Sequence, residues 1–580
     1  MAGSGSSDAA FKAKLNKRTH YNEWLMLALI LSLAAIALGF VVLHHVRRLG
    51  RRAEGNDRPS PVARLSRNVR RVALCNVKGL PSVGHVGVVA AYAAINVVIA
   101  FVNITHSPLP LITNVAARMA WVALGNLVVV IFLALKNTPL GYISPWSYEK
   151  LNILHQVAGY TTVTAVILHA SLYSAYFMEG GNWRKLLRKE EIYGMVAGIS
   201  LLLVGFSGAI LRRWWYEIFF VSHIVFWILA IVMVPLHQPS LSRKVIVVSA
   251  VVVGLWVVDR VFRFARFLLY SVNNSVKLTP LSGGSTRVTL AKAPVGTVAG
   301  QHCFLWIPKV RPFETHPFTV ASLDPLEFVV ATHSGFTRAL NEYAVSHRHI
   351  SLMGSVEGPY GSSLDAAGYD TIVMVAGGSG ASFAFGVVMT MLQKMRSDES
   401  KHIVFIWTVR ESSYLEWFNQ QLKTLRADNR VSTLLFVTRE QAPQLLKEKA
   451  EPQSPSSSLT RGNENDLEAA RSVSHSSAGW SETERSRPSD AGTSVTHVGT
   501  SATQVATERP SAVHGIPIAY ERPDVAGLVR KAIQDTPRGK RVLALTCGPK
   551  KMSDNVRNTT ASCIGADGPA VELHCEQFGW

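Results

Sequence analysis

The amino-terminal half of this 580-residue chain is organised by long apolar runs, which alternate with short basic segments. Six runs carry no charged residue, and each is near or above the ~18 residues that a helix needs to cross a bilayer. A seventh, at 245–258, is shorter and is expected to continue past Asp259 and Arg260 to residue 269. The pattern predicts a seven-span helical membrane domain over residues 25–270. The six longer runs cover 25–43, 86–104, 119–135, 151–177, 192–211 and 218–236.

Short alternating segments replace the long runs after residue 270. Strand-like stretches at 287–290, 302–307 and 328–332 predict a small antiparallel β-barrel over residues 271–365. Buried-strand runs then alternate with helical stretches, so residues 366–580 are expected to form an α/β domain. Its strands are predicted at 371–376, 402–408, 431–437 and 541–546, and one helix at 383–395.

Residues 449–515 interrupt this alternation, because they are rich in Ser, Thr and Glu and almost free of aliphatic periodicity. Such a composition cannot bury enough apolar surface to offset the entropy of folding. We therefore expect a disordered insertion at about 450–515 within the α/β domain. The sequence leaves open whether the insertion is a phosphorylation target or a linker without a role.

Lysine and arginine gather beside the predicted spans, where they indicate the orientation of the chain. Because basic loops stay in the cytoplasm, residues 1–24 are expected to form an extracytoplasmic tail and the carboxyl-terminal half to be cytoplasmic. A smaller basic loop at 184–189 would then lie outside, but the cluster between the first two spans outweighs it. That cluster comprises Arg47, Arg48, Arg51, Arg52, Arg58, Arg64, Arg67, Arg70, Arg71 and Lys78.

The formal net charge of +20 would also fit a nucleic-acid-binding protein. Much of the excess adjoins membrane spans, however, so anionic membrane lipid is the expected partner and nucleic acid is not. The first span is longer than the apolar core of a secretion signal and no cleavage site follows it, so we expect it to remain in the mature protein. The five cysteines show neither a disulfide framework nor zinc-ligand spacing.

Four histidines within the apolar spans form two pairs with one repeated spacing: His155 and His169, then His223 and His237. Fourteen residues separate the members of each pair, which on a helix is about 21 Å of rise and within roughly 40° of the same face. Parallel helices would place His155 opposite His223 and His169 opposite His237. A single such histidine could equally be a hydrogen-bonding or interfacial residue. The repeated interval favours the axial ligands of two b-type haems, and two imidazoles per iron favour electron transfer.

Two short motifs occur in the predicted barrel, and each could be a buried turn as readily as part of a ligand site. They are His316-Pro317-Phe318-Thr319 and Gly335-Phe336-Thr337-Arg338. In the α/β domain, a predicted strand leads directly into a glycine-rich turn and then a helix. Such a turn lets a phosphate approach backbone amides at the helix amino terminus. A purely structural turn is the alternative, because the full G-x-G-x-x-G pattern is absent from Gly377-Gly378-Ser379-Gly380-Ala381-Ser382.

Arginines follow two of the predicted strands, Arg410 after the second and Arg439 after the third. A guanidinium in either place could bind the 2′-phosphate of a dinucleotide and favour NADPH over NADH. An ordinary solvent-exposed arginine explains either position equally well.

Taken together and in this order, the motifs resemble the fungal ferric reductase family, within the larger group that includes the NADPH oxidases. The resemblance covers about residues 140–580 apart from the insertion. It implies a di-haem membrane domain with a four-helix core, followed by a ferredoxin-NADP reductase-like module: a β-barrel FAD domain and an α/β nucleotide-binding domain. Besides the histidines, it rests on His316 to Thr319, Gly358-Pro359-Tyr360-Gly361, Gly377 to Ser382, Cys547-Gly548-Pro549 and Phe578-Gly579-Trp580.

The resemblance implies a role for each motif. The four histidines would be haem ligands. His316 to Thr319 would hold the flavin ring and ribityl region of FAD, and Gly335 and Thr337 would lie by its pyrophosphate.

At the nucleotide site, the resemblance implies that Gly377 to Ser382 bind the phosphates of NADPH. Cys547 to Pro549 would lie beside the nicotinamide. Trp580 would stack on the isoalloxazine until nicotinamide displaces it, so Trp580 and Cys547 are the candidate catalytic residues. Glu576 is a further candidate near the flavin.

The implied function is an NADPH-dependent ferric-chelate reductase of the plasma or vacuolar membrane. Electrons would pass from cytosolic NADPH through FAD and two b-type haems to ferric or cupric ions or chelates, which would support reductive iron uptake beside an iron permease and a multicopper oxidase. Many relatives carry a secreted, Cys-containing ectodomain. None is expected here, because only about 20 residues precede the first span.

Two other functions remain open from the sequence. A superoxide-generating NADPH oxidase would use the same cofactors, but the extra first span and the equal histidine spacings argue against it. A catalytically silent flavocytochrome relative with an assembly or signalling role is the other, and the intact nucleotide motifs argue against that.

Overall fold

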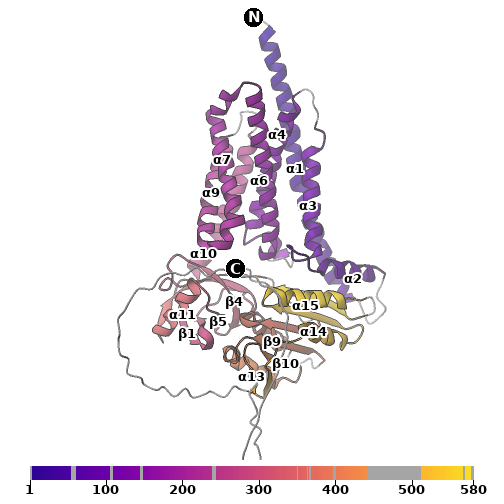
Figure 1. Ribbon diagram of the computed structural model, residues 1–580, viewed down its shortest axis with the longest axis vertical. Helices are drawn as coiled ribbons and strands as arrows, with labels where there is room; N and C mark the ends of the chain where they lie inside the picture. The colour runs from indigo at the N-terminus through magenta and orange to yellow at the C-terminus, as the bar shows by residue number, and fades with distance from the viewer. Residues whose placement is uncertain are drawn as a thin grey trace, which may run out of the picture. The chain divides into compact units, whose positions relative to one another are not determined.

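The computed structural model contains a helical bundle followed by two β-sheet domains (Figure 1). It describes residues 3–53, 61–104, 109–143, 148–237, 243–348, 350–361, 364, 368–395, 400–441, 511–565 and 568–576. Within these residues, seven helices are long and apolar enough to cross a membrane, which confirms the predicted spans. They are α1 (Gly3–Ala53), α3 (Val83–Phe101), α4 (Leu111–Ala134), α6 (Tyr148–Glu179), α7 (Lys189–Phe206), α9 (Tyr216–Leu236) and α10 (Lys244–Leu269).

The first span extends further than predicted, whereas the seventh continues to residue 269 as predicted. Residues 3–24 were expected as a tail but continue the first span as helix α1, because helix-forming residues are frequent there and proline is absent. Helix α10 runs unbroken through the charged residues near its end. Asp259 is tolerated inside it because Asn137 donates hydrogen bonds of 3.0 and 2.9 Å to Asp259 Oδ1.

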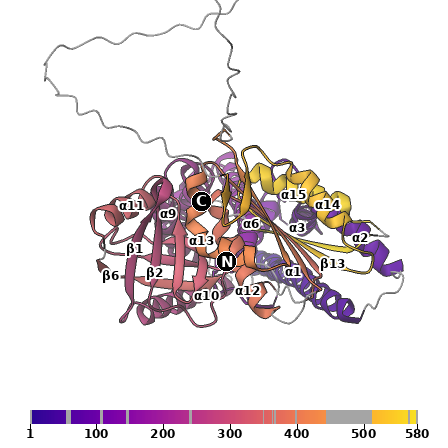
Figure 2. The same ribbon diagram turned by 90° about the horizontal axis from the view of Figure 1, so that it is seen from below.

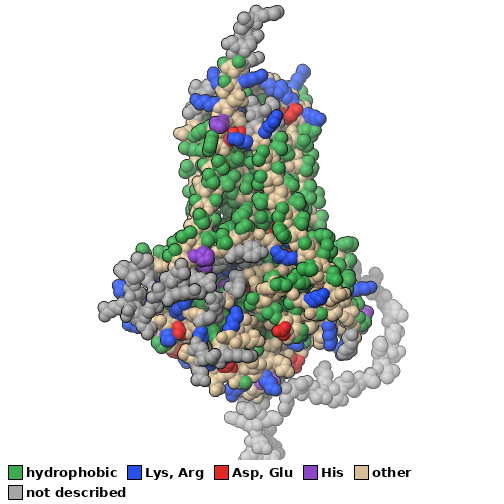
Figure 3. Space-filling view, turned by 180° about the vertical axis from the view of Figure 1, so that it is seen from behind, with side chains coloured by type: hydrophobic (Ala, Val, Ile, Leu, Met, Phe, Trp, Pro, Cys, Tyr) green, Lys and Arg blue, Asp and Glu red, His purple; other side chains and the backbone are tan. Residues whose placement is uncertain are grey.

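Helix α4 is the central span of the bundle, since 67% of its apolar window is buried, against 11–22% for the other spans. Hydrophobic side chains cover the outside of the bundle, and Lys and Arg gather at its upper end in the view of Figure 3. The central position of α4 places its backbone carbonyls against the neighbouring helix α6. The shorter elements of this half are α2 (Pro61–Leu74), α5 (Pro139–Ile143), the 3-10 turn η1 (Trp183–Leu187), the π-helical turn η2 (Ser207–Leu211) and α8 (Arg212–Trp214).

The first sheet has seven antiparallel strands in the order β6-β1-β2-β5-β4-β3-β7. The three predicted strands correspond to β2, β3 and β5, so the antiparallel domain is confirmed. The segment with the His-Pro-Phe-Thr motif is strand β4 and not a turn, and helix α11 (Phe336–Ser346) was not foreseen. The strands are β1 (Ser275–Leu281), β2 (Ser285–Leu290), β3 (His302–Trp306), β4 (His316–Leu323), β5 (Leu326–Val330), β6 (Ser351–Met353) and β7 (Ser355–Tyr360), with turn η3 (Ser282–Gly284).

The second sheet has the order β11-β12-β10-β9-β8-β13-β14, and all its neighbouring strands from β12 to β14 are parallel. All four predicted strands are present. They are β8 (Thr371–Gly377), β9 (His402–Val409), β10 (Val431–Val437) and β13 (Arg541–Cys547), and the others are β11 (Ala512–Val513), β12 (Ile516–Ala519) and β14 (Ala570–Glu576). Most of the expected insertion, residues 450–510, lies outside the described residues; β11 lies inside the range predicted for it.

Helices cover both faces of this sheet (Figure 2). Alternate β8 residues point to opposite faces, so Ile372 packs in the core with α12 and α13, and Val373 packs in the core with α14 and α15. This arrangement leaves the carboxyl ends of the parallel strands as the open edge. The helices are α12 (Ala381–Lys394), α13 (Asn419–Ala427), α14 (Val525–Gln534) and α15 (Lys550–Cys563), with 3-10 turns η4 (Gly378–Gly380) and η5 (Ser412–Phe418).

Candidate functional site

The four histidines of the membrane domain lie on two helices. His155 and His169 are on α6, His223 is on α9, and His237 caps the carboxyl end of α9. The ring centroids of His155 and His223 are 6.5 Å apart, and those of His169 and His237 are 6.1 Å apart. The structure therefore brings together the pairs that the spacing predicts.

All four imidazoles have a hydrogen-bond partner at Nδ1. An Nδ1–H held by an acceptor leaves Nε2 unprotonated, which is the form that ligates a metal. The hydroxyl of Ser207 donates to Val204 O at 2.8 Å, so it acts as the acceptor for His223. The partners are Val130 O for His155 (3.0 Å), Ala116 O for His169 (2.9 Å), Ser207 Oγ for His223 (3.1 Å) and Glu190 O for His237 (2.9 Å).

The distance between opposed rings fits a metal ion held between them. Two metal–imidazole bonds of about 2 Å, plus roughly 1 Å from each Nε2 to its ring centre, give centroids about 6 Å apart. A Cβ on Gly194 would lie 2.5 Å from Nδ1 of His237, so only glycine leaves room for that ring. The residues present therefore fit a bis-histidine haem at each level.

The two barrel motifs meet at the start of α11. His316 and Phe318 alternate along β4, and their rings stack on Phe336 with centroids 4.6 and 6.1 Å apart. Gly335 precedes the helix with φ +65°, a conformation that favours glycine. Thr337 Oγ1 accepts a backbone hydrogen bond of 2.8 Å within the turn. An aromatic platform beside a helix amino terminus can hold a phosphate-linked ring system.

The glycine-rich turn and the Cys-Gly-Pro motif pack against each other at the carboxyl ends of β8 and β13. A Cβ on Gly380 would collide with the carbonyl oxygen of Cys547, and one on Gly377 would lie 2.6 Å from Pro549 Cδ. The chain runs outward from β8 to β10 and returns on the other side as β13. This reversal of strand order is where open α/β sheets bind ligands.

The two serines of the turn have different positions. Ser379 is exposed at its tip. Ser382 is 3% exposed and its hydroxyl donates to Val329 O of β5 at 3.5 Å, so its side chain faces the barrel. Of the two, Ser379 is the one open to a ligand.

Arg410 immediately follows β9, and Arg439 lies two positions after the end of β10. The backbone N–H of Arg439 donates to Arg410 O at 3.0 Å, and both side chains are exposed. Both guanidiniums therefore belong to the same strand edge as the glycine-rich turn. The geometry does not distinguish between them.

Cys547 ends β13 and is 3% exposed. Burial raises the pKa of its thiol, and the neighbouring Glu576 carboxylate raises it further. Glu576 lies opposite Cys547 on β14 and pairs with His574 Nε2 at 2.9 Å. Cys547 is thus a neutral thiol and not a ready nucleophile. Trp580, with Phe578 and Gly579, lies outside the described residues.

A polar cluster between the membrane helices and the barrel was missed by the sequence analysis. Arg263 of α10 pairs with Glu357 of β7, which also accepts a hydrogen bond from Tyr360. Lys136, just after α4, has Nζ 3.2 Å from the centroid of the Phe304 ring. Burial lowers the pKa of Lys136 well below its ordinary value. Isolated charges so far apart in the sequence form no pattern that could have predicted the cluster.

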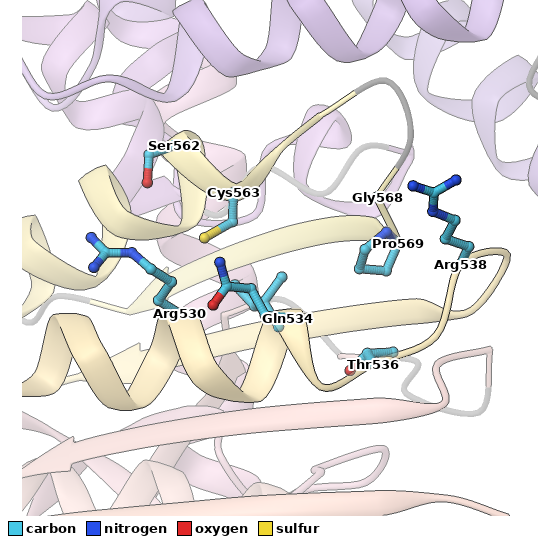
Figure 4. A pocket seen from close by; sticks show the side chains of 9 residues that line it. Arg530, Gln534, Thr536, Arg538, Ser562, Cys563, Gly568 and Pro569 are labelled. Carbon is cyan, nitrogen blue, oxygen red and sulfur yellow. The ribbon is translucent and has the colours of Figure 1, made fainter.

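A cavity of about 400 Å³ lies between α14 and α15, at the amino-terminal edge of the second sheet (Figure 4). None of the predicted site residues lines it. Its walls are Arg530, Ile533, Gln534, Thr536, Arg538, Ser562, Cys563, Gly568 and Pro569.

Three family models match consecutive parts of the chain. "Ferric reductase like transmembrane component" matches residues 119–234, "FAD-binding domain" residues 272–364, and "Ferric reductase NAD binding domain" residues 369–561. These ranges coincide with the histidine-bearing bundle, the antiparallel sheet and the α/β sheet.

Curated fungal proteins are similar over long stretches. Ferric reductase transmembrane component 1 of Schizosaccharomyces pombe is 26% identical over 53% of this chain and 62% of its own length. Ferric/cupric reductase transmembrane component 2 of Saccharomyces cerevisiae is 24% identical over 80% of this chain and 61% of its own length. Probable cell surface ferric reductase kap2 of Aspergillus oryzae is 26% identical over 64% of this chain and 52% of its own length. The chain thus spans less than two thirds of each relative.

Solved structures of flavin-dependent reductases are similar over about half of the chain. A ferredoxin NADP+ reductase from Neisseria gonorrhoeae with bound FAD and NADP is 12% identical over 52% of this chain and 97% of that one, with a TM-score of 0.31. Phthalate dioxygenase reductase is 12% identical over 53% of this chain and 68% of that one, with a TM-score of 0.28. The three consecutive family models and the fungal relatives carry the assignment: the chain belongs to the ferric reductase family.

Proposed function

We propose that this chain carries electrons from NADPH, through FAD and two b-type haems, across a membrane to ferric or cupric ions or their chelates. The observation that carries the proposal is the pair of opposed imidazole couples, His155 with His223 and His169 with His237, at 6.5 and 6.1 Å. Bound FAD would accept two electrons from NADPH and release them singly, and bound haem would carry them one at a time.

The task of the membrane helices is to fix the four imidazoles. Carbonyls of α4 orient both α6 histidines, because Ala116 O and Val130 O accept their Nδ1 protons. Ser207 and the backbone of Glu190 do the same for the other two. Each Nε2 would then be unprotonated and able to bind a haem iron.

The barrel would hold FAD at the junction of β4 and α11. His316 and Phe318 would lie along the flavin and ribityl region, and the amides of Gly335 and Thr337 would meet the pyrophosphate. Tyr360 and Glu357 connect this domain to α10 through Arg263.

The α/β domain would bind NADPH at the reversal of strand order. The backbone of Gly377 to Gly380 would hold its phosphates, and Arg410 or Arg439 would select the 2′-phosphate. A neutral, buried Cys547 suits a place beside the nicotinamide, because it adds no charge there. Trp580 would cover the flavin until nicotinamide arrives, and Glu576 would lie near the same ring.

The proposed orientation puts the amino terminus outside and the reductase module in the cytoplasm of a plasma or vacuolar membrane. The basic cluster from Arg47 to Lys78, between the first two apolar runs, supports it. An iron permease and a multicopper oxidase are the expected pathway neighbours. No contact with them is implied.

The terminal acceptor separates this proposal from an NADPH oxidase. Purified full-length protein should reduce Fe(III) chelates with NADPH as sole donor, and should do so in the presence of superoxide dismutase. Rapid oxygen reduction that leaves the chelates untouched would overturn the proposal in favour of the oxidase. Absence of any NADPH-driven haem reduction would favour a catalytically silent relative.

A further inference from the structure

Helix α2 exposes a narrow apolar stripe. Leu65, Val69 and Val72 are 65%, 54% and 59% exposed. They are spaced i, i+4 and i+7, so they lie on one face of the helix. Three neighbouring aliphatic side chains in water are unfavourable, which indicates that another apolar phase covers them.

Two exposed arginines border the stripe. Arg64 and Arg71 are seven residues apart and therefore share one side of the helix, next to Leu65 and Val72. An apolar stripe bordered by guanidiniums matches a surface that is apolar inside and negatively charged outside.

The opposite face of α2 is fixed to the nucleotide-binding domain. Leu74 packs against the core cluster of α14 and α15, and Arg67 Nη1 donates to Gly568 O at 3.4 Å. Just beyond the helix, the backbone N–H of Asn76 donates to Asn558 Oδ1 at 3.0 Å. These contacts hold the helix so that Leu65, Val69 and Val72 stay exposed.

The chain itself ties α2 to the end of the membrane bundle. Helix α2 lies between the spans α1 and α3, and only residues 75–82 separate Leu74 from the start of α3. Figure 1 shows it crosswise at the foot of α3. A helix tethered there can reach the membrane surface without any rearrangement of the spans.

We propose that α2 lies in the membrane–water interface, with Leu65, Val69 and Val72 in the lipid and Arg64 and Arg71 on anionic headgroups. Because its other face contacts the nucleotide-binding domain, the helix braces that domain against the membrane. Anionic lipid would therefore stabilise the assembled reductase. The bilayer therefore covers Leu65, Val69 and Val72, rather than a second copy of the chain or a cytosolic protein.

The first test measures burial of the stripe in the full-length protein. A nitroxide is attached at Val69→Cys in a Cys75→Ser background, because Cys75 is also exposed. As a control, the Cys75→Ser protein without Val69→Cys is labelled in the same way, and its signal gives the amount of nitroxide attached to other cysteines. In bilayers that contain phosphatidylserine, the nitroxide should be accessible to oxygen and shielded from a polar nickel complex. Access of the nickel complex in these bilayers would overturn the proposal.

The second test measures the role of charge. Arg64→Gln with Arg71→Gln should raise the fraction of phosphatidylserine needed to shield the nitroxide, because each arginine contributes roughly fivefold to binding at an anionic surface. The matched control, Lys423→Gln with Arg426→Gln on α13, removes the same charge from an exposed helix and should leave that fraction unchanged. An equal shift in both variants would contradict specific headgroup binding. Neither measurement needs turnover, so they succeed or fail independently of the proposed reductase activity.

Discussion

Arg263 and Glu357 form a two-point ion pair that joins the last membrane helix to the barrel. Nε and Nη2 of Arg263 each lie 2.9 Å from one carboxylate oxygen of Glu357. The side chains are only 16% and 6% exposed. A buried, two-point pair of this kind fixes the orientation of the two domains as well as their contact.

Glu357→Gln should uncouple the two halves of the reaction. Removing one partner leaves Arg263 buried without its counter-charge, a change that costs about 3–5 kcal/mol in comparable pairs. We expect flavin reduction by NADPH to stay within twofold of the parent, and haem reduction to slow by at least tenfold. Stopped-flow spectroscopy at flavin and haem wavelengths separates the two steps.

The control for this variant is Glu572→Gln, which removes the ion-pair partner of Arg541 on β14 in the second sheet. It should change neither rate. Equal loss of flavin and haem reduction in Glu357→Gln, or loss of bound FAD, would contradict a role confined to the junction.

Lys136→Met should change how stability depends on pH. Burial, reinforced by the charge of Arg263, lowers the pKa of Lys136 well below 10.5, although Glu357 opposes the shift. Between that lowered value and 10.5 the folded state binds fewer protons than the unfolded one, so the free energy of unfolding rises with pH. The variant should lack this rise. Thermal unfolding of detergent-solubilised protein across alkaline pH measures it, and an identical slope in both proteins would refute the assignment.

Ser207→Ala should weaken one haem site and not the other. It removes the acceptor of His223 Nδ1, whereas the other three histidines use backbone carbonyls. Loss of such a partner typically lowers metal affinity about 10–100-fold. Haem titration of the apoprotein should show one weakened and one normal site. Ser200→Ala is the control, because the Ser200 hydroxyl donates to Val196 O of its own helix at 2.7 Å; equal effects of both variants would be evidence against the anchor.

Gly380→Ala should impair NADPH binding. The added methyl group would collide with Cys547 O and push the two loops apart, an overpacking that typically costs 1–3 kcal/mol, or roughly 5–150-fold in affinity. Gly565→Ala, where nothing lies within 4 Å of the new Cβ, should bind NADPH normally. Calorimetry with the non-reducing ligand NADP+ provides the comparison. Parent-like affinity in Gly380→Ala would mean that these loops do not form the site.

Periodic patterns made the membrane domain predictable. Span length follows from bilayer thickness, and the fourteen-residue interval from helix geometry, so His155 and His223 could be paired before their positions were known. The buried strand before Gly377 was equally clear, because continuous apolar runs bounded by glycine predict central parallel strands.

Contacts between distant segments were not predictable. The anchor of His223 depends on a π-helical turn at Ser207, which has no sequence signature. Strand β4 was ambiguous because His316 to Thr319 lacks alternation, and its place is set by pairing with β3 and β5. Arg263 and Glu357 are 94 positions apart and meet only in the folded chain.

The central claim is that paired imidazoles hold two haems that NADPH can reduce. The most direct measurement is the reduced-minus-oxidised absorbance spectrum of purified full-length protein, with NADPH as sole donor and haem counted per chain. The account predicts two b-type haems per chain, both reduced, and one in His169→Ala or His237→Ala. A colourless protein, or a full haem content in either variant, would contradict it.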